Sequence, residues 1–185
     1  MKLSHLPISP SKTLLRFANR IATLGTGPVL DAPCGYGRNA VALASLGCSV
    51  VGVDNDPRRL SALEQSRSTY IAQGSLTGRC GQIATVCAEL RPDRWLFAPS
   101  SFSAIICIHF EMIDILPCLI LSLQKGGYVY IETFGGHGQN FRALPKVGEL
   151  RDLLGRDMEF EYYKERRVGP AEFNSVCVTL FAQKS

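Results

Sequence analysis

The sequence predicts an α/β fold, in which a mostly parallel sheet is covered by helices on both faces. Apolar strand-like runs alternate with helical patterns along the chain, and several of these runs are apolar at nearly every position, as in strands buried on both faces. The 185 residues suit one domain, and the apolar fraction of 46% is typical of globular proteins. We therefore expect a single domain over residues 1–185.

The first half of the chain is expected to contain a helix followed by three strands with helices between them. Strands are expected at 29–31, 49–54 and 83–87, and helices at 10–24, at 37–46 and from Pro57 to about Ala72. Pro57 suits a first helical turn, where its missing N–H costs no hydrogen bond. The apolar residues of the first helix, expected to cover one edge of the domain, are Leu14, Leu15, Phe17, Ala18 and Ile21.

The second half is expected to complete five strand–helix units and to end in a hairpin. Strands are expected at 104–109 and 128–133, and helices at 112–123 and 145–154. Pro117 indicates that the first of these helices is kinked or begins late, and Gly126-Gly127 should end it. Strands at 159–167 and 176–182 leave no room for a helix between them, so they should pair antiparallel.

Charge and cysteine content argue against several classes of protein. The net charge of +4 is small, and basic and acidic residues are interspersed, which does not indicate a nucleic-acid-binding surface. The seven cysteines form no Cys-x-x-Cys pair and have no zinc-like spacing with histidine, so we expect no metal site. Residues 1–10 do not resemble a signal peptide, and no apolar run is long enough to span a membrane. These features together favour a reducing, cytoplasmic location.

The turn after the first strand is the strongest candidate for a ligand site. Gly35 and Gly37 lie between that strand and a helix, where glycine lets the backbone approach a ligand closely. Asp31 and Asp54 end the first and second strands, and ligands of open α/β sheets bind beyond such strand ends. A carboxylate at the position of Asp54 is typical of residues that bind a ribose diol.

The residues around the turn favour one ligand class over two others. A dinucleotide site wants Gly-x-Gly-x-x-Gly, and here Ala40 takes the last position, which some variants allow. Asp31, however, would repel a pyrophosphate and attract an ammonium group. A P-loop is excluded because no Gly-Lys-Ser/Thr follows. The pattern therefore favours a ligand that carries both an ammonium and a ribose, and an NAD-dependent enzyme remains the weaker alternative.

At this point the sequence resembles the class I S-adenosylmethionine-dependent methyltransferases, from residue 29 to the C-terminus. The matching segments are Val-Leu-Asp-Ala-Pro-Cys-Gly-Tyr-Gly at 29–37, Val-Gly-Val-Asp at 51–54, Ala-Glu-Leu at 88–90 and Leu-Gln-Lys-Gly-Gly at 123–127. The wording Cys-Gly-x-Gly-Arg-Asn is most similar to small tellurite-resistance-like methyltransferases, as are Glu-Thr-Phe at 132–134 and Gly-Glu-Leu at 148–150. The resemblance implies a Rossmann-like, seven-stranded sheet of order 3-2-1-4-5-7-6 with an antiparallel last strand.

The resemblance also implies that S-adenosyl-L-methionine is the cofactor and S-adenosyl-L-homocysteine the product. Asp31, Gly35 and Gly37 would hold the methionine part, and Asp54 the ribose. Pro33 departs from the family's usual glycine and removes one backbone donor. The implied cofactor-binding positions are Asp31, Ala32, Pro33, Gly35, Gly37, Asn39, Asp54, Asn55, Glu89, Leu90 and Ile108.

Candidates for a catalytic base follow the fourth and fifth strands. His109 ends an apolar strand, where a catalytic and a buried structural histidine are about equally expected. Glu111 is a second candidate, although capping of the next helix is the better interpretation. Glu132 needs a partner if buried, so a structural ion pair competes with substrate contact. His137 lies in a Gly-Gly-His-Gly loop that either closes over substrate or is a plain solvent loop.

Three further residues have two interpretations each, and Glu149 has one. Cys34 is expected to be a small packed residue rather than a thiolate. Tyr36 and Trp95 either stack on adenine or substrate or pack within the fold. Glu149 is expected at a helix N-terminus, where its charge is favourable.

We therefore expect S-adenosylmethionine-dependent methyl transfer to a small-molecule acceptor. No Asn/Asp-Pro-Pro-Tyr/Phe signature follows the fourth strand, which disfavours base methylation of nucleic acid, and residues 1–27 are expected to form a helical segment that covers the cofactor and substrate side. The alternatives are a catalytically degenerate cofactor-binding or regulatory subunit, and methylation of a macromolecule. The acceptor atom stays open, as does the choice between monomer and homodimer.

Overall fold

The computed structural model describes residues 9–72, 81–133, 135 and 140–185. The chain divides into two compact units, Met1–Glu89 and Leu90–Ser185. His137 and residues 73–80 lie outside the described residues. None of the described helices is both long and apolar enough to cross a membrane.

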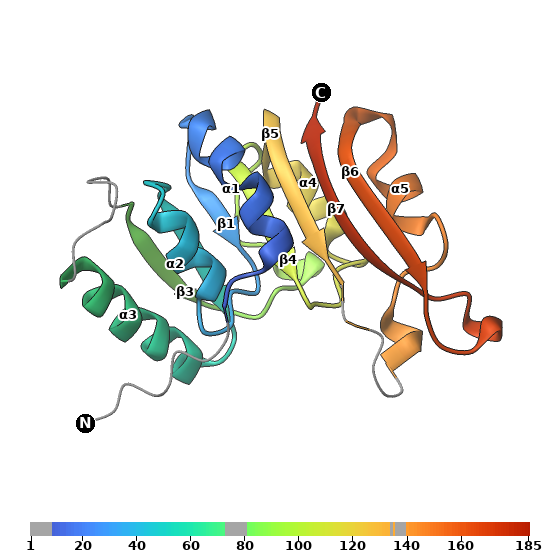
Figure 1. Ribbon diagram of the computed structural model, residues 1–185, viewed down its shortest axis with the longest axis horizontal. Coiled ribbons are helices and arrows are strands. Elements are labelled where there is room, and N and C mark those ends of the chain that lie inside the picture. Colours follow the sequence, from blue (N-terminus) through green and yellow to red (C-terminus); the bar gives the residue numbers. More distant parts are fainter. Residues whose placement is uncertain (1–8, 73–80, 134, 136–139) are drawn as a thin grey trace. The chain divides into compact units, whose positions relative to one another are not determined.

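The first unit contains three parallel strands and three helices (Figure 1). The strands pair in parallel, with Val29 opposite Val50 and Val50 opposite Ile83, so their carboxyl ends lie at one edge. That edge is the lower one of this unit in Figure 1, and the turn after the first strand begins there. In chain order the elements are α1 (Lys12–Leu24), β1 (Val29–Asp31), α2 (Arg38–Ala44), β2 (Val50–Asp54), α3 (Pro57–Ala72) and β3 (Ile83–Cys87).

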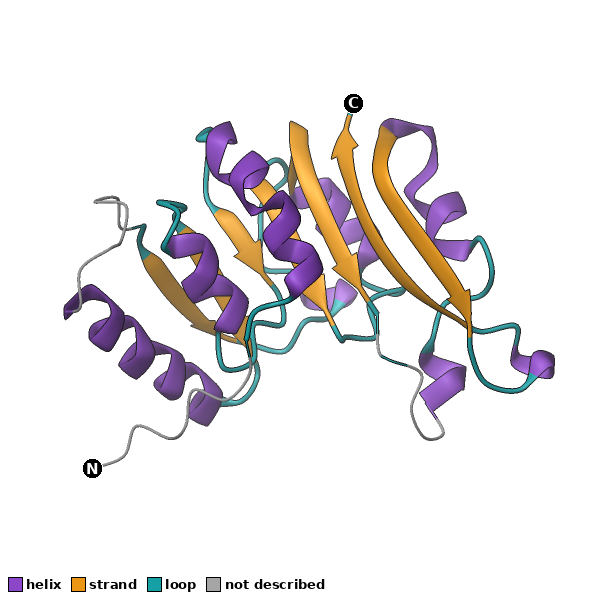
Figure 2. Ribbon diagram, viewed as in Figure 1, coloured by secondary structure: helices purple, strands orange, loops and turns teal. Residues whose placement is uncertain are grey.

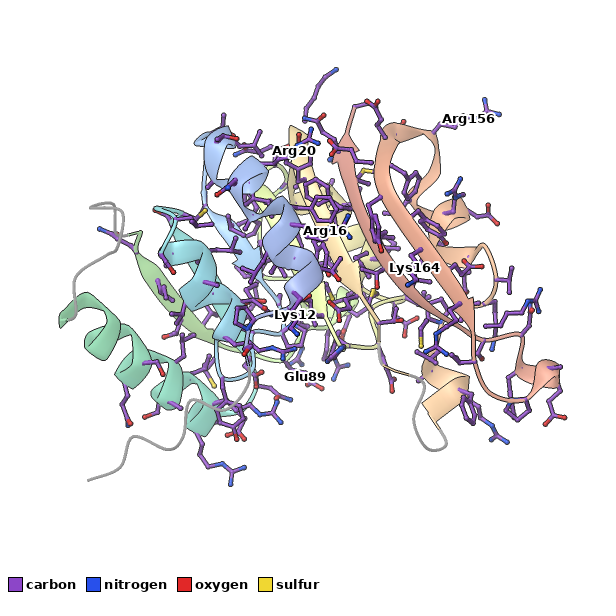
Figure 3. The ribbon with its side chains drawn as sticks, in the orientation of Figure 1. Lys12, Arg16, Arg20, Glu89, Arg156 and Lys164 are labelled. Carbon is purple, nitrogen blue, oxygen red and sulfur yellow. The ribbon has the colours of Figure 1, made fainter. Side chains whose placement is uncertain are left out.

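Helix α1 begins at a side-chain cap and buries one face. The hydroxyl oxygen of Ser11 accepts a hydrogen bond from the N–H of Leu14 at 3.2 Å, which satisfies one of the donors left free at a helix start. Leu14, Ala18 and Ile21 are buried as expected, but Leu15 is 45% exposed, so its predicted place on the apolar face is wrong. The cations Lys12, Arg16 and Arg20 are exposed along α1 (Figure 3).

The start of α1 is tied to the start of α2. The N–H of Ser11 donates to Oδ1 of buried Asn39 at 3.0 Å, across 28 positions of sequence. The guanidinium of Arg38 donates to the carbonyl oxygen of Ser9 at 3.3 Å. Residues just before α1 are therefore held beside the helix that follows the glycine turn.

The second unit contains four strands, of which β7 alone runs antiparallel to its neighbours β5 and β6 (Figure 2). Helices α4 and α5 lie on one side of its strands. The register of the β4–β5 pair is interrupted between Phe102 and Ala104, and that of the β6–β7 pair between Phe160 and Tyr162. In chain order the elements are η1 (Pro92–Arg94), β4 (Phe102–Ile108), α4 (Leu116–Ser122), β5 (Leu123–Glu132), η2 (Asn140–Ala143), α5 (Glu149–Leu154), η3 (Gly155–Asp157), β6 (Met158–Arg167), η4 (Ala171–Phe173) and β7 (Val176–Lys184).

Two predicted helices are shorter than expected, and one expected unit lacks its helix. The helix expected at 112–123 starts only at Leu116, because Pro117 fits only in a first turn. Gly126-Gly127 does not end it, since β5 begins directly at Leu123 and contains both glycines. The helix expected at 145–154 starts at Glu149, after Gly148 in a left-handed conformation. Between β3 and β4 only the short helical turn η1 is found, so the expected five strand–helix units are four.

The order of the strands agrees with the expectation from the resemblance. The seven strands follow the order β3-β2-β1-β4-β5-β7-β6. Tyr128 lies opposite Gln183 and Met158 opposite Lys184, both in antiparallel pairs, which confirms the predicted terminal hairpin. The predicted fold class is therefore confirmed.

Candidate functional site

The glycine turn of the first unit is held by the carboxylate of Asp54. This side chain is 2% exposed, and its Oδ2 accepts a hydrogen bond from the N–H of Gly35 at 3.0 Å. Its Oδ1 accepts from the N–H of Asp56 at 2.9 Å and lies 3.5 Å from the guanidinium of Arg59. Asp54 thus fixes the turn in space, and each carboxylate oxygen retains a further lone pair for a ligand hydroxyl.

The two glycines of the turn serve different purposes. Both have positive φ, +55° at Gly35 and +76° at Gly37, which favours glycine. A Cβ at Gly37 would lie 2.1 Å from Cδ1 of Leu63, so Gly37 is required by the packing of α3. A Cβ at Gly35 would meet no atom within 4 Å. Of the two, only Gly35 therefore borders open space in which a ligand could approach the backbone.

Asp31 is a buried acid without a partner. It is 0% exposed, and neither carboxylate oxygen has a hydrogen-bond partner among the described residues. Burial raises its pKa from 3.8 to about 7, and the charge of Asp54 adds to the rise, while the nearby N–H of Ala40 and the charge of Arg38 oppose it. An uncompensated buried carboxylate is costly, so this position calls for a cationic or hydrogen-bonding ligand.

Among the remaining residues of the turn, Ala32 and Cys34 are buried within the first unit and Tyr36 is exposed. Cys34 is buried, and burial raises the pKa of its thiol well above the ordinary value, as do the charges of Asp31 and Asp54. The interpretation of Cys34 as a packed residue is therefore confirmed. Ala32 is buried, and the peptide bond between Ala32 and Pro33 is cis. Tyr36 is 57% exposed, so among the described residues it does not pack as a core aromatic.

The other positions implied for cofactor binding are spread over both units. Asn39 is buried and uses its side-chain oxygen to hold Ser11, a structural contact that its sequence position did not indicate. Asn55 and Glu89 are exposed, the latter just beyond β3 (Figure 3). Leu90 is partly exposed and Ile108 is buried at the end of β4; both belong to the second unit.

In the second unit, the structure brings His109 and Glu132 together. Nε2 of His109 lies 3.6 Å from Oε1 of Glu132, and the N–H of His109 donates to the carbonyl oxygen of Glu132 at 2.7 Å. The hydroxyl of Tyr130 donates to Oε2 of Glu132 at 2.8 Å. Sequence reasoning missed Tyr130, although its place two residues before Glu132 puts both side chains on one face of a strand.

Other candidates of the second unit have structural roles or no contact with this cluster. Glu111 is exposed and does not cap α4, because that helix begins five residues later after Ile115; the capping prediction is wrong. Trp95 donates its indole N–H to the hydroxyl of Ser122 at 2.8 Å and packs edge-on against Phe97, so it is a packing residue. Glu149 lies in the first turn of α5 and accepts from the N–H of Lys146, as predicted for a helix start.

Comparisons with known proteins agree with the geometry. A family model described as "Methyltransferase domain" matches residues 29–119. No curated protein matched the chain in a sequence search.

Three solved structures illustrate the likeness in fold. TehB from Haemophilus influenzae shares 19% identity at a TM-score of 0.64, covering 91% of this chain and 61% of TehB. Magnesium protoporphyrin IX methyltransferase (ChlM) from Synechocystis PCC 6803 with bound SAM shares 18% identity at a TM-score of 0.65, and the match covers 94% of this chain and 78% of ChlM. A SAM-dependent methyltransferase from Methanosarcina mazei shares 20% identity at a TM-score of 0.62, and the match covers 96% of this chain and 99% of that protein. The chain thus spans 61% of the length of TehB, and at these identities the structures show a shared fold.

Proposed function

Because a family model described as "Methyltransferase domain" matches residues 29–119, we propose that this protein transfers the methyl group of S-adenosylmethionine to a small-molecule acceptor. The family match and the strand order support the reaction class. The small acceptor is supported by ChlM, whose name gives a porphyrin as its substrate. A single methyltransferase domain over residues 1–185 and a cytoplasmic location stay predictions.

The observation that carries the proposal is the buried carboxylate of Asp31. Its two oxygens lack hydrogen-bond partners among the described residues, and the cofactor offers an ammonium group on its methionine part. Gly35, four residues later, leaves open space where a side chain would otherwise project. A buried acid with no partner beside an open backbone fits a cationic ligand better than a pyrophosphate.

We assign the other contacts by position. Asp54 would accept hydrogen bonds from the ribose hydroxyls while it continues to hold Gly35, and Asn55 and Glu89 would lie beside the adenine. The roles that the resemblance implies for Leu90, beside the adenine, and for Ile108, beside the methyl donor, stay predictions. Ala32, Pro33, Gly37 and Asn39 would support the turn from within, as their packing and hydrogen bonds already do. Bound cofactor supplies an electrophilic methyl group; the chain's residues bind it, orient it and exclude water from it.

The N-terminal segment is proposed to cover this side of the first unit. Arg38 and Asn39, which directly follow the turn, hydrogen-bond Ser9 and Ser11. These contacts keep the residues that precede α1 next to the proposed cofactor turn. They support the expectation that residues 1–27 lie on the cofactor side.

Calorimetry with S-adenosylhomocysteine tests the proposal directly. Wild-type protein should bind, and Asp31→Asn should weaken binding about tenfold or more, because a charge-assisted contact to the ammonium is lost. Asp54→Ala should abolish measurable binding. Asp93→Asn is the matched control, since it neutralises an exposed acid paired with Arg91 in the second unit. If the wild type does not bind, or if Asp54→Ala binds as well as the wild type, the proposal is wrong.

Turnover separates an enzyme from a degenerate binding subunit. Protein that binds S-adenosylhomocysteine should convert methyl-labelled S-adenosylmethionine with a library of thiols, phenols, amines and carboxylates. Binding without any turnover on that library, and equally without turnover on total RNA or protein, would instead support a regulatory subunit. Labelling of RNA or protein alone would support a macromolecular acceptor.

A further inference from the structure

Three side chains of the second unit form a chain of contacts that no comparison assigns a role. The hydroxyl of Tyr130 touches Glu132, and Glu132 in turn faces His109. We propose that His109 is a general base for a protic acceptor, and that Glu132 and Tyr130 are positioning residues for it. This inference rests on the proposed methyl transfer and names its substrate class: a small molecule whose accepting oxygen, nitrogen or sulfur carries a proton.

The backbone holds His109 in one place relative to Glu132. Ile108 and Glu132 lie opposite each other in the parallel pair of β4 and β5. Directly after the strand, His109 adopts a left-handed conformation with φ of +56°, and its N–H donates to the carbonyl oxygen of Glu132. Such a conformation is uncommon for a residue other than glycine. The strand end thus places the imidazole of His109 beside the carboxylate of Glu132, the same residue whose carbonyl oxygen accepts the hydrogen bond from the backbone N–H of His109.

The three side chains are ordered from the core outward. Tyr130 is 0% exposed, the side chain of Glu132 is 25% exposed, and that of His109 is 45% exposed. A buried hydroxyl thus holds one oxygen of the carboxylate, and the other oxygen faces the ring. Only the imidazole end of this chain is accessible enough to meet a small molecule.

The geometry also selects which ring nitrogen is the base. Nε2 faces Glu132, so the favoured neutral tautomer carries its proton on Nε2, where the carboxylate attracts it. Nδ1 then presents its lone pair. A carboxylate that orients an imidazole and stabilises its protonated form is a recurrent arrangement in general-base catalysis.

The proton balance of the reaction follows. The acceptor X–H provides a lone pair for the new X–C bond, and the electron pair of the broken carbon–sulfur bond stays on sulfur. Nδ1 of His109 takes the proton from X, Glu132 stabilises the resulting imidazolium, and the proton then passes to water. The products are X–CH₃, S-adenosylhomocysteine and one proton, with no oxidant or reductant required.

Acceptors of different acidity distinguish a base from a structural histidine. At pH 8 phenol is protonated, whereas 4-nitrophenol is largely ionised and needs no base. His109→Asn keeps a residue that tolerates the left-handed backbone but cannot take the proton. It should reduce kcat/KM on phenol 100-fold or more and on 4-nitrophenol less than fivefold.

The positioning residues have their own variants. Glu132→Gln should reduce kcat/KM on phenol by at least tenfold and Tyr130→Phe by about threefold to tenfold, again with little effect on 4-nitrophenol. Tyr128→Phe is the matched control, because Tyr128 lies two residues earlier in β5, is nearly as buried, and stacks on Phe181. It should leave both rates unchanged.

A spectroscopic measurement tests the arrangement without turnover. With three histidines in the chain, the ¹⁵N signals of His109 are assigned by their loss in His109→Asn. At high pH they should show the Nε2–H tautomer in wild type and a more even mixture in Glu132→Gln.

The outcomes separate this inference from the proposed function. Failure to bind S-adenosylhomocysteine removes the proposed function itself. Normal binding, combined with an equal rate loss on phenol and 4-nitrophenol in His109→Asn, or with the same tautomer in wild type and Glu132→Gln, overturns the base. Cofactor turnover only on acceptors that carry no proton, such as thioethers and tertiary amines, or on no member of the panel overturns it as well.

Discussion

At the scale of single residues, the most informative side chain is Asp31. Most buried acids are paired, whereas this one has no hydrogen-bond partner in the described part of the chain, and burial raises its pKa to about 7. The folded protein therefore binds a proton at Asp31 that the unfolded chain has already released above pH 4. Burial without a hydrogen-bond partner among the described residues thus makes ionised Asp31 costly, and it also makes Asp31 suited to a cationic ligand.

The first prediction concerns stability. Because the pKa of Asp31 is raised in the folded state, ionisation of Asp31 opposes folding. The contribution of Asp31 to the free energy of unfolding therefore falls as the pH rises from about 4 and is lowest above about pH 7. Asp31→Asn should therefore gain stability relative to wild type between pH 5 and pH 8, by on the order of 3 kcal/mol. Urea unfolding of both proteins at the two pH values measures this. A constant difference between them across that range would show that Asp31 is ionised at no special cost.

The second prediction concerns Gly35. Gly35→Ala adds a Cβ in open space, so it should cost only about 1 kcal/mol of folding stability from its positive φ but weaken S-adenosylhomocysteine binding at least tenfold. Gly25→Ala is the matched control in the same unit, with φ of +62° and no atom closer than 4.0 Å to the added Cβ. Unfolding and calorimetry on both variants should give equal stabilities and different affinities. Equal affinities would mean that the space over Gly35 is not the ligand site.

At the scale of elements, the bounds of α3 and of two strands were predicted from the sequence, whereas the starts of α4, α5 and β5 were not. The strand at 29–31 and the strand at 83–87 were predicted with their observed bounds, because apolar runs between turn residues leave little choice. The helix start at Leu116 depends on how Pro117 is accommodated, which the apolar pattern of 112–123 does not reveal. Gly127 was taken for a helix stop, although a Cβ there would meet the carbonyl oxygen of Ser103 at 2.7 Å, a contact visible only once β4 and β5 pair.

The candidate site shows the same division. Asp31, Gly35 and Asp54 were found because the chemistry of a strand end is local in sequence. The structural use of Asn39 and of Tyr130 was not, because each depends on a contact formed by folding: Asn39 with Ser11, 28 positions away, and Tyr130 with Glu132, which depends on both side chains sharing one face.

The third prediction belongs to the link between α1 and α2. Asn39→Ala leaves the N–H of Ser11 without its acceptor, so we expect a loss of about 1–3 kcal/mol in unfolding free energy and faster hydrogen exchange at Ser11. Asn19→Ala, on the exposed side of α1, should be neutral or slightly stabilising because alanine is the better helix former. Unchanged exchange at Ser11 in Asn39→Ala would show that this contact does not hold the helix start.

At the scale of the whole molecule, the proposed roles divide along the two compact units. The carboxylates and the turn proposed for the cofactor lie in Met1–Glu89, and the proposed base with its positioning residues lies in Leu90–Ser185. Variants of Asp31, Gly35 and Asp54 should therefore lower cofactor affinity, whereas His109→Asn should lower turnover and leave S-adenosylhomocysteine affinity within about twofold of wild type.

The buried carboxyl group of Asp31 would also determine which ligands are excluded from the proposed site. A ligand that brings an ammonium to Asp31 lets the carboxylate ionise with a partner, whereas an analogue that lacks the amino-acid portion leaves the acid protonated and gains nothing from it. A ligand with a carboxylate or phosphate in the same place would be repelled by the ionised carboxylate of Asp31, because the two charges have the same sign. In the proposed site, such a residue would select ligands by charge before any contact with the base or the sugar is made.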